Sequence, residues 1–174
     1  FIYVGGESDA WVDDALKNAV NKDMKVIDLL DVLGNSIKEE EVVEGMQAKE
    51  EESEEGEEEE GPEYDEHVWL SLRNAEALCK AIEEDLAKID PNNAEVYQKN
   101  NEAYTEKLSA LDKEYRRVVD ASANKTLLFG DRFPFRYLVD DYGLKYYAAF
   151  VGCSAETEAS FATVKFLAEK ADEL

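Results

Sequence analysis

The first thirty residues alternate between short apolar runs and helically spaced apolar positions. Residues 1–4 form an apolar run that ends at two glycines, as a buried strand entering a turn does. Residues 25–28 predict a second strand, and Ser8 or Asp9 is expected to cap the helix between the two strands. This helix carries Trp11, Val12, Ala15, Leu16 and Val20 at helical spacing. Strand, helix and strand in this order open an α/β unit. The chain starts directly on this pattern, so we expect it to be the central piece of a longer protein.

Two long helices are predicted in the middle of the chain. The first keeps a spacing of three to four residues through Leu72, Ala75, Leu78, Cys79, Ile82, Leu86 and Ile89. Residues 90–93, Asp-Pro-Asn-Asn, break this helix and begin the next. The second helix runs from Ala94 to about Ala121 and is therefore about 40 Å long. A helix of this length is expected to be a rigid spine that joins two lobes.

The last fifty residues predict a second α/β half. Residues 126–129 form a strand, and residues 130–132, Gly-Asp-Arg, form a loop at its carboxyl end. A short helix follows and is closed by Gly143, before a second strand over residues 145–151. Residues 152–156 form the exit loop of that strand, and Ser160 is expected to cap a final helix.

Charge is concentrated in one segment of the 174-residue chain. The formal net charge is −23, which excludes nucleic acid and anionic lipid as partners, because both would be repelled. Residues 39–66 include a run dominated by Glu, which predicts a solvated, mobile loop with nothing to bury. This loop is either a plain acidic linker or a loose collector of cations beside a metal site.

The remaining composition narrows the class of protein further. No apolar run of the sequence is long enough to span a bilayer. The chain has two cysteines, too few for a disulfide framework, and Cys79 lies among apolar helix positions as a core residue would. It has no glycine-rich phosphate loop and no serine elbow.

Residues 65–71, Asp-Glu-His-Val-Trp-Leu-Ser, carry the most specific signal of the sequence. They resemble the motif of the zinc- and manganese-binding solute-binding proteins of ABC importers, in which an acidic residue, a variable residue and a metal-ligating His precede an apolar-Trp-Leu run. Other features of the chain occur in the same order as in that family. The acidic loop comes before the His, and the long helix, Tyr-Gly-Leu at 142–144 and a Glu-rich stretch at 156–160 come after it.

The resemblance implies an α/β, two-lobed fold of the periplasmic-binding-protein type, joined by a long backbone helix and only partly present here. Such a protein captures Zn²⁺, in preference to Mn²⁺, outside the cytoplasm as a lipid-anchored monomer and delivers it to an ABC permease without catalysis. The implied parts are residues 1–38 (end of the N-terminal αβ lobe), 39–66 (acidic loop), 67–93 (helix of that lobe), 94–125 (linking helix) and 126–174 (start of the C-terminal αβ lobe).

The resemblance also implies the metal ligands. His67 is the only His of the chain and matches the family's ligand, and a neutral imidazole suits Zn²⁺. The place of a second family His holds Arg132, which cannot ligate a metal because it stays protonated. Asp131, Cys153 and Glu156 are then the candidate replacements, and a Cys153 thiolate would favour zinc over manganese. Each has a plainer alternative: Asp131 caps a helix or pairs with Arg132, Cys153 fills a core, and Glu156 is solvated at a helix start.

Two other functions stay open from the sequence. An α/β enzyme would place its site on loops that follow strands, here at Asp131 and Cys153. A cell-adhesion protein or scaffold would use the acidic loop to hold basic partners.

Overall fold

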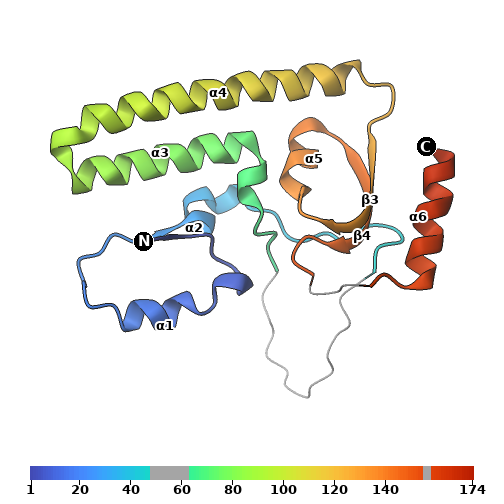
Figure 1. The fold of residues 1–174 in the computed structure, drawn as a ribbon, viewed down its shortest axis with the longest axis horizontal. Helices are drawn as coiled ribbons and strands as arrows, with labels where there is room; N and C mark the ends of the chain where they lie inside the picture. Colours follow the sequence, from blue (N-terminus) through green and yellow to red (C-terminus); the bar gives the residue numbers. More distant parts are fainter. Residues whose placement is uncertain (48–62, 155–157) are drawn as a thin grey trace.

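The computed structural model describes residues 1–47, 63–154 and 158–174, which form two small α/β units beside a long helical hairpin (Figure 1). Glu156 and the most acidic part of the predicted loop, residues 48–62, lie outside these described residues. Within the described ranges, no helix combines the length and the apolar character needed to cross a bilayer.

The first α/β unit pairs β1 (Ile2–Tyr3) with β2 (Ile27–Asp28) in parallel, with α1 (Val12–Lys17) between them and α2 (Leu29–Leu33) after them. The expected cap of α1 is wrong. Neither Ser8 nor Asp9 caps it, because both belong to a separate 3₁₀ turn, η1 (Glu7–Asp9). The Asp9 carboxylate instead accepts hydrogen bonds from the main-chain N–H groups of Val4 and Gly5, at 2.9 and 3.1 Å, and so closes the turn after β1.

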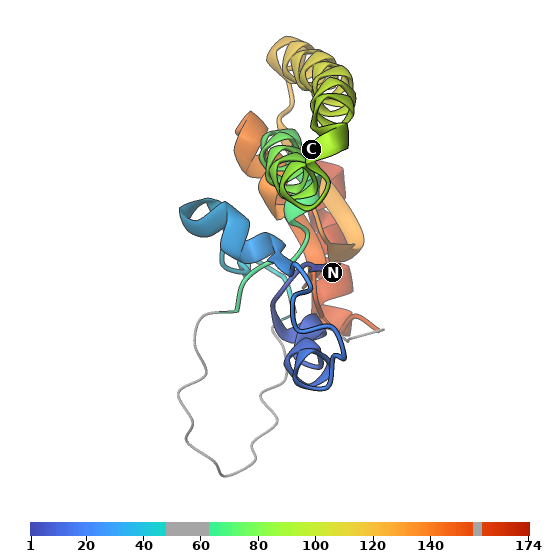
Figure 2. The same ribbon diagram turned by 90° about the vertical axis from the view of Figure 1, so that its left-hand side faces the viewer.

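The two predicted long helices are confirmed and pack as an antiparallel hairpin. They are α3 (Leu72–Ile89) and α4 (Ala94–Ala121), joined by η4 (Pro91–Asn93), and they lie side by side in both views (Figures 1 and 2). Ser71 caps α3, because its hydroxyl accepts a hydrogen bond from the N–H of Asn74 at 3.1 Å. The Asp90 carboxylate accepts hydrogen bonds from Asn93 and Tyr97 and thereby fixes the turn between the helices.

The second α/β unit is a parallel pair of strands with one connecting helix and one following helix. Its elements are β3 (Thr126–Phe133), α5 (Arg136–Tyr142), β4 (Lys145–Val151) and α6 (Phe161–Glu173). Gly143 ends α5 in the left-handed conformation, with φ of 63°, which a residue without a Cβ adopts at little cost. Ser160 caps α6 as expected, since its hydroxyl accepts a hydrogen bond from the N–H of Thr163 at 3.1 Å.

The predicted loop at residues 130–132 is wrong, because β3 continues to Phe133. Arg132 and Phe133 pair with Phe150 and Val151 of β4, and the register shifts between Phe129 and Arg132. This irregularity adds residues to β3 without ending its pairing, as a β-bulge does.

The described ends of the predicted acidic loop are packed rather than solvated. Glu39 forms an antiparallel bridge with Tyr64, and Met46 is buried in a cluster with Phe133 and Tyr146. The solvated segment expected over residues 39–66 therefore does not include these ends. The domain boundaries implied by the resemblance stay a prediction.

Tyr137, on α5 of the second unit, packs against residues of the first unit and of the hairpin. Its side chain is 2% exposed and packs in one cluster with Leu30, Val68 and Leu78. A tyrosine from α5 therefore shares a core with α2, α3 and the turn that carries His67.

Candidate metal centre

The turn at Asp65 and His67 is fixed by its own hydrogen bonds. The main-chain N–H of His67 donates to Asp65 Oδ1 at 2.8 Å, and His67 Nδ1 lies 3.2 Å from the same oxygen. Asp65 is 2% exposed, and its main-chain N–H donates to the carbonyl of Lys38. The carboxylate is thus held in place and orients the imidazole ring.

The Asp65 contact decides which ring nitrogen is available for a ligand. When Nδ1 carries the hydrogen that faces Asp65, Nε2 presents its lone pair, as in a carboxylate–histidine–metal arrangement. The hydrogen bond to Asp65 raises the pKa of His67 above its usual value, and partial burial opposes this rise. The charges of Asp65, Glu66 and Glu40 raise the pKa further. These carboxylates favour a positive charge at the ring, whether a proton or a metal ion supplies it.

Sequence reasoning assigned no role to Asp65. The signal was present, because an acidic residue two positions before the His is part of the motif at residues 65–71. Its burial and its bond to the ring depend on the fold, and these show it as the partner that orients His67.

Cys153 faces His67 from the loop that follows β4. Its Sγ lies 4.0 Å from His67 Nδ1, and its main-chain N–H donates to Glu40 Oε1 at 3.0 Å. Burial raises the pKa of the Cys153 thiol to about 12, and the charges of Glu40 and Asp65 add to this rise. Without a cation the sulfur therefore keeps its proton, and it can act as a ligand only when a metal displaces that proton.

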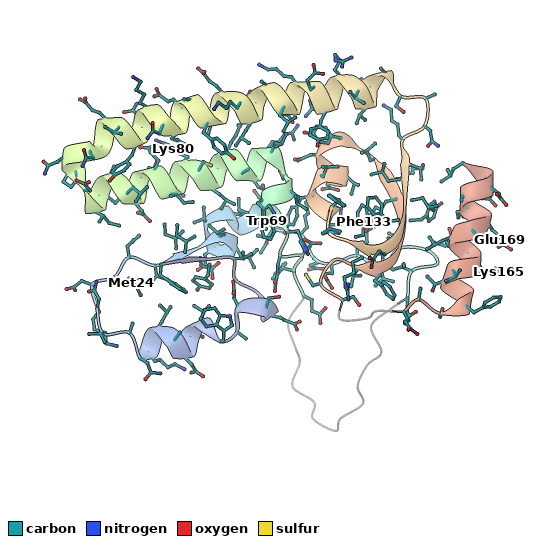
Figure 3. The ribbon with its side chains drawn as sticks, in the orientation of Figure 1. Met24, Trp69, Lys80, Phe133, Lys165 and Glu169 are labelled. Atoms are coloured by element: carbon teal, nitrogen blue, oxygen red, sulfur yellow. The ribbon has the colours of Figure 1, made fainter. Side chains whose placement is uncertain are left out.

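His67 and Cys153 open onto one hollow of about 350 Å³. The first unit contributes Val4 and Asp9 to its wall, and the turn at residues 65–71 contributes Glu66 and Trp69. The Trp69 ring lies 5.7 Å from the His67 ring, and Figure 3 shows Trp69 where α3 meets the second unit. The hollow thus lies where both units and the start of the hairpin meet.

The other predicted ligands are placed differently. Asp131 is exposed on β3, its carboxylate accepts a hydrogen bond from the N–H of Arg132 at 2.8 Å, and it does not line the described wall of the hollow. Glu156 lies outside the described residues. Within residues 1–47, 63–154 and 158–174, no three His, Cys, Asp or Glu side chains gather as a metal-binding group. The full ligand set therefore stays a prediction.

Comparison of the whole chain with known proteins leads to metal-binding proteins, as the motif around His67 does. The family described as "Zinc-uptake complex component A periplasmic" (ZnuA) matches residues 1–174. The zinc-binding lipoprotein AdcA of Streptococcus pneumoniae is 33% identical over 175 residues, which is 97% of this chain and 32% of AdcA. The iron ABC transporter substrate-binding lipoprotein MtsA of Streptococcus pyogenes is 43% identical over 145 residues, which is 80% of this chain and 40% of MtsA.

The fold agrees with these relatives. The crystal structure of the metal-dependent lipoprotein YcdH from Bacillus subtilis superposes with a TM-score of 0.71 at 29% identity, over 99% of this chain and 56% of YcdH. This confirms the predicted α/β fold. The chain spans about a third to just over half of the length of these relatives. The match over every residue, together with the shared fold, shows that the chain belongs to the ZnuA family, as the motif at residues 65–71 predicted.

Proposed function

We propose that this chain is part of a metal carrier that captures Zn²⁺ outside the cytoplasm and delivers it to an ABC permease. The carrier is proposed to be a lipid-anchored monomer, as the family resemblance implies. AdcA and YcdH are both named lipoproteins, and MtsA is named an ABC transporter substrate-binding lipoprotein, which supports the proposal.

The arrangement of His67 and Cys153 carries this proposal. An imidazole held by a buried carboxylate and a thiol from the loop after β4 border the same hollow. The sulfur lies 4.0 Å from Nδ1, the ring nitrogen that faces Asp65, so ligation together with Nε2 requires the Cys153 side chain to turn toward Nε2. Nitrogen and sulfur are the donors that Zn²⁺ prefers in proteins, usually in sets of four. His67 and Cys153 are the proposed core of the site, and Asp131 and Glu156 remain proposed ligands beside them.

The choice of zinc rests on the sulfur. A thiolate suits Zn²⁺ better than Mn²⁺, because manganese favours carboxylate, carbonyl and water oxygens. AdcA is named for zinc, whereas MtsA is named for iron, so the relatives alone do not decide the metal. Cys153 is the residue of this chain that favours zinc.

A carrier role also fits the thiol better than catalysis does. A nucleophilic cysteine needs a lowered pKa, and burial raises the pKa of Cys153 to about 12. Closed coordination by four protein ligands leaves no position for an activated water. We therefore propose binding and release without turnover.

Zinc titration of the intact protein and of its His67→Ala variant tests the proposal. The expected result is a large loss of zinc affinity in His67→Ala, because the substitution removes the imidazole ligand. Gln98→Ala, on an exposed position of α4, is the control and should bind zinc as the wild-type protein does. Equal zinc affinity of His67→Ala and wild type would remove the central assignment.

A further inference from the structure

Arg132, which the family resemblance sets in the place of a metal-ligating His, reaches the loop that follows β4. Its Nε donates a hydrogen bond to the main-chain carbonyl of Ser154 at 2.5 Å. Ser154 is 6% exposed, so this contact is partly shielded from water. The irregular pairing of β3 between Phe129 and Arg132 lies directly before this arginine. The side chain thus holds Ser154, within residues 152–154, the described part of the loop that follows β4.

Gly152, directly after β4, lies close to β3 and to the His67 turn. A Cβ added at Gly152 would lie 3.0 Å from Asp65 Oδ2, 3.0 Å from the carbonyl oxygen of Phe133 and 3.2 Å from His67 Cε1. Glycine therefore allows the loop to approach the His67 turn closely. Glu40 holds the middle, where it accepts the hydrogen bond from the N–H of Cys153.

We propose that Arg132 is a positioning residue that fixes the loop 152–154, so that the Cys153 sulfur faces His67. Through this contact it sets the preference of the site for a cation that accepts a sulfur ligand. This inference rests on the proposed function. When the loop is released, the sulfur leaves, and the remaining nitrogen and oxygen donors favour zinc over manganese less strongly.

The positive charge of Arg132 also affects metal affinity directly, and the experiment must separate this effect from positioning of the sulfur. A cation beside the site repels every divalent metal to a similar degree, since this repulsion depends on charge and distance. Positioning of the sulfur changes the ratio of zinc to manganese affinity instead. The ratio, and not the absolute affinity, is therefore the measurement that reports positioning.

The experiment compares the intact wild-type protein with Arg132→Met, Arg132→Lys and Cys153→Ser. Co²⁺ replaces Zn²⁺ as a spectroscopic probe, because a thiolate ligand gives a sulfur-to-cobalt charge-transfer band in the near ultraviolet. The band is expected in the wild type, absent in Cys153→Ser and largely lost in Arg132→Met. The zinc-to-manganese affinity ratio should fall about tenfold in Arg132→Met, if loss of the sulfur weakens zinc binding by the lower end of the roughly 10–100-fold that removal of a ligand-orienting residue costs and leaves manganese binding unchanged. Arg132→Lys keeps the charge but lacks the planar guanidinium, so it should recover only part of the band.

Arg117→Met is the matched control, because Arg117 is exposed on α4 and pairs with Glu114. A wild-type band in Arg132→Met, or a band that persists in Cys153→Ser, overturns the inference. If Arg132→Met does not fold, Arg132→Lys carries the test, and a band of wild-type intensity in that variant also overturns the inference. Failure of the proposed function is distinct, because zinc binding would then be unaffected by His67→Ala.

Discussion

The phenol of Tyr137 donates a hydrogen bond to the main-chain carbonyl of Asp65 at 2.7 Å, across 72 residues of sequence. The same hydroxyl accepts a hydrogen bond from the N–H of Lys38 at 3.0 Å. A side chain of the second unit therefore supports the turn that orients His67. Cys153 lies on a loop of that same unit, so Tyr137 couples the positions of the two proposed ligands.

Replacing Tyr137 by Phe should destabilise the protein by about 1–3 kcal/mol, because the Asp65 carbonyl and the Lys38 N–H lose a buried partner. Urea denaturation of the variant and the wild type measures the difference. Tyr104→Phe, at a position on α4 that is 52% exposed, should leave the free energy of unfolding nearly unchanged. Equal losses in both variants would show that the hydroxyl of Tyr137 has no special role.

Asp65→Asn should weaken zinc binding by about 10–100-fold, because an amide orients the ring without the charge that supports it. The same substitution should lower the pKa of His67, since the Asp65 hydrogen bond is the largest cause of its rise. An NMR titration, in which the His67 signal is identified by its loss in His67→Ala, measures this pKa. A pKa that stays raised in Asp65→Asn would contradict this account of the turn.

Phe133→Ala should cost about 3–5 kcal/mol of stability, the usual range for a buried phenylalanine. Phe133 is 2% exposed, and its ring stacks on Tyr146 with centroids 3.9 Å apart. Phe161→Ala removes a ring that is 84% exposed and should change stability little. Chemical denaturation of the two variants measures the free energy of unfolding after removal of a buried and of an exposed phenylalanine ring.

Asp140 should make stability fall in acid. The hydrogen bond from Lys38 lowers the pKa of Asp140, Arg136 lowers it further, and partial burial opposes them. A native pKa below the unfolded one means that the unfolded chain binds the proton more readily. This contribution is therefore complete above the unfolded pKa of about 3.9 and is lost as pH falls through the native value.

Asp140→Asn should accordingly be less stable than wild type at neutral pH and should approach it in acid. The difference should stay below about 1 kcal/mol, since the Lys38 and Asp140 side chains are each 41% exposed. Thermal denaturation across acidic pH measures it, with Asp120→Asn on α4 as the control. A difference that stays constant with pH would argue against the ion pair.

Deletion of residues 48–62 separates the carrier from the adhesion alternative. Zinc affinity should remain nearly unchanged, whereas an adhesion protein that uses its acidic segment would lose its basic partner. The deletion spares Glu40 and Met46, which contact Cys153 and the core of the second unit. A large loss of zinc affinity would instead favour the cation-collecting role of this segment.

The periodicity of apolar residues predicted the two long helices and the strand β4 correctly. α3 and α4 have the predicted ends, and β4 covers the predicted residues 145–151, because long apolar patterns are little affected by single neighbours. β3 was placed too short, since Gly130 and Asp131 are typical turn residues. Pairing of Arg132 and Phe133 with β4 outweighs that preference.

The candidate site was predictable only in part. The resemblance of residues 65–71 to a family motif pointed to His67, and the family's use of the loop after the next strand pointed to Cys153. The bond from Arg132 to Ser154 links residues 22 positions apart, and the approach of Gly152 to Asp65 depends on packing of both units. No local pattern contains such contacts.

The length of α4 has a mechanical consequence. A continuous helix of 28 residues, about 42 Å long, with a second helix braced along it, resists bending. It behaves as a strut, so a large scissor movement of the two ends would have to break helical hydrogen bonds. The distance between the two α/β units is then expected to stay nearly constant whether or not a cation enters the hollow beside His67.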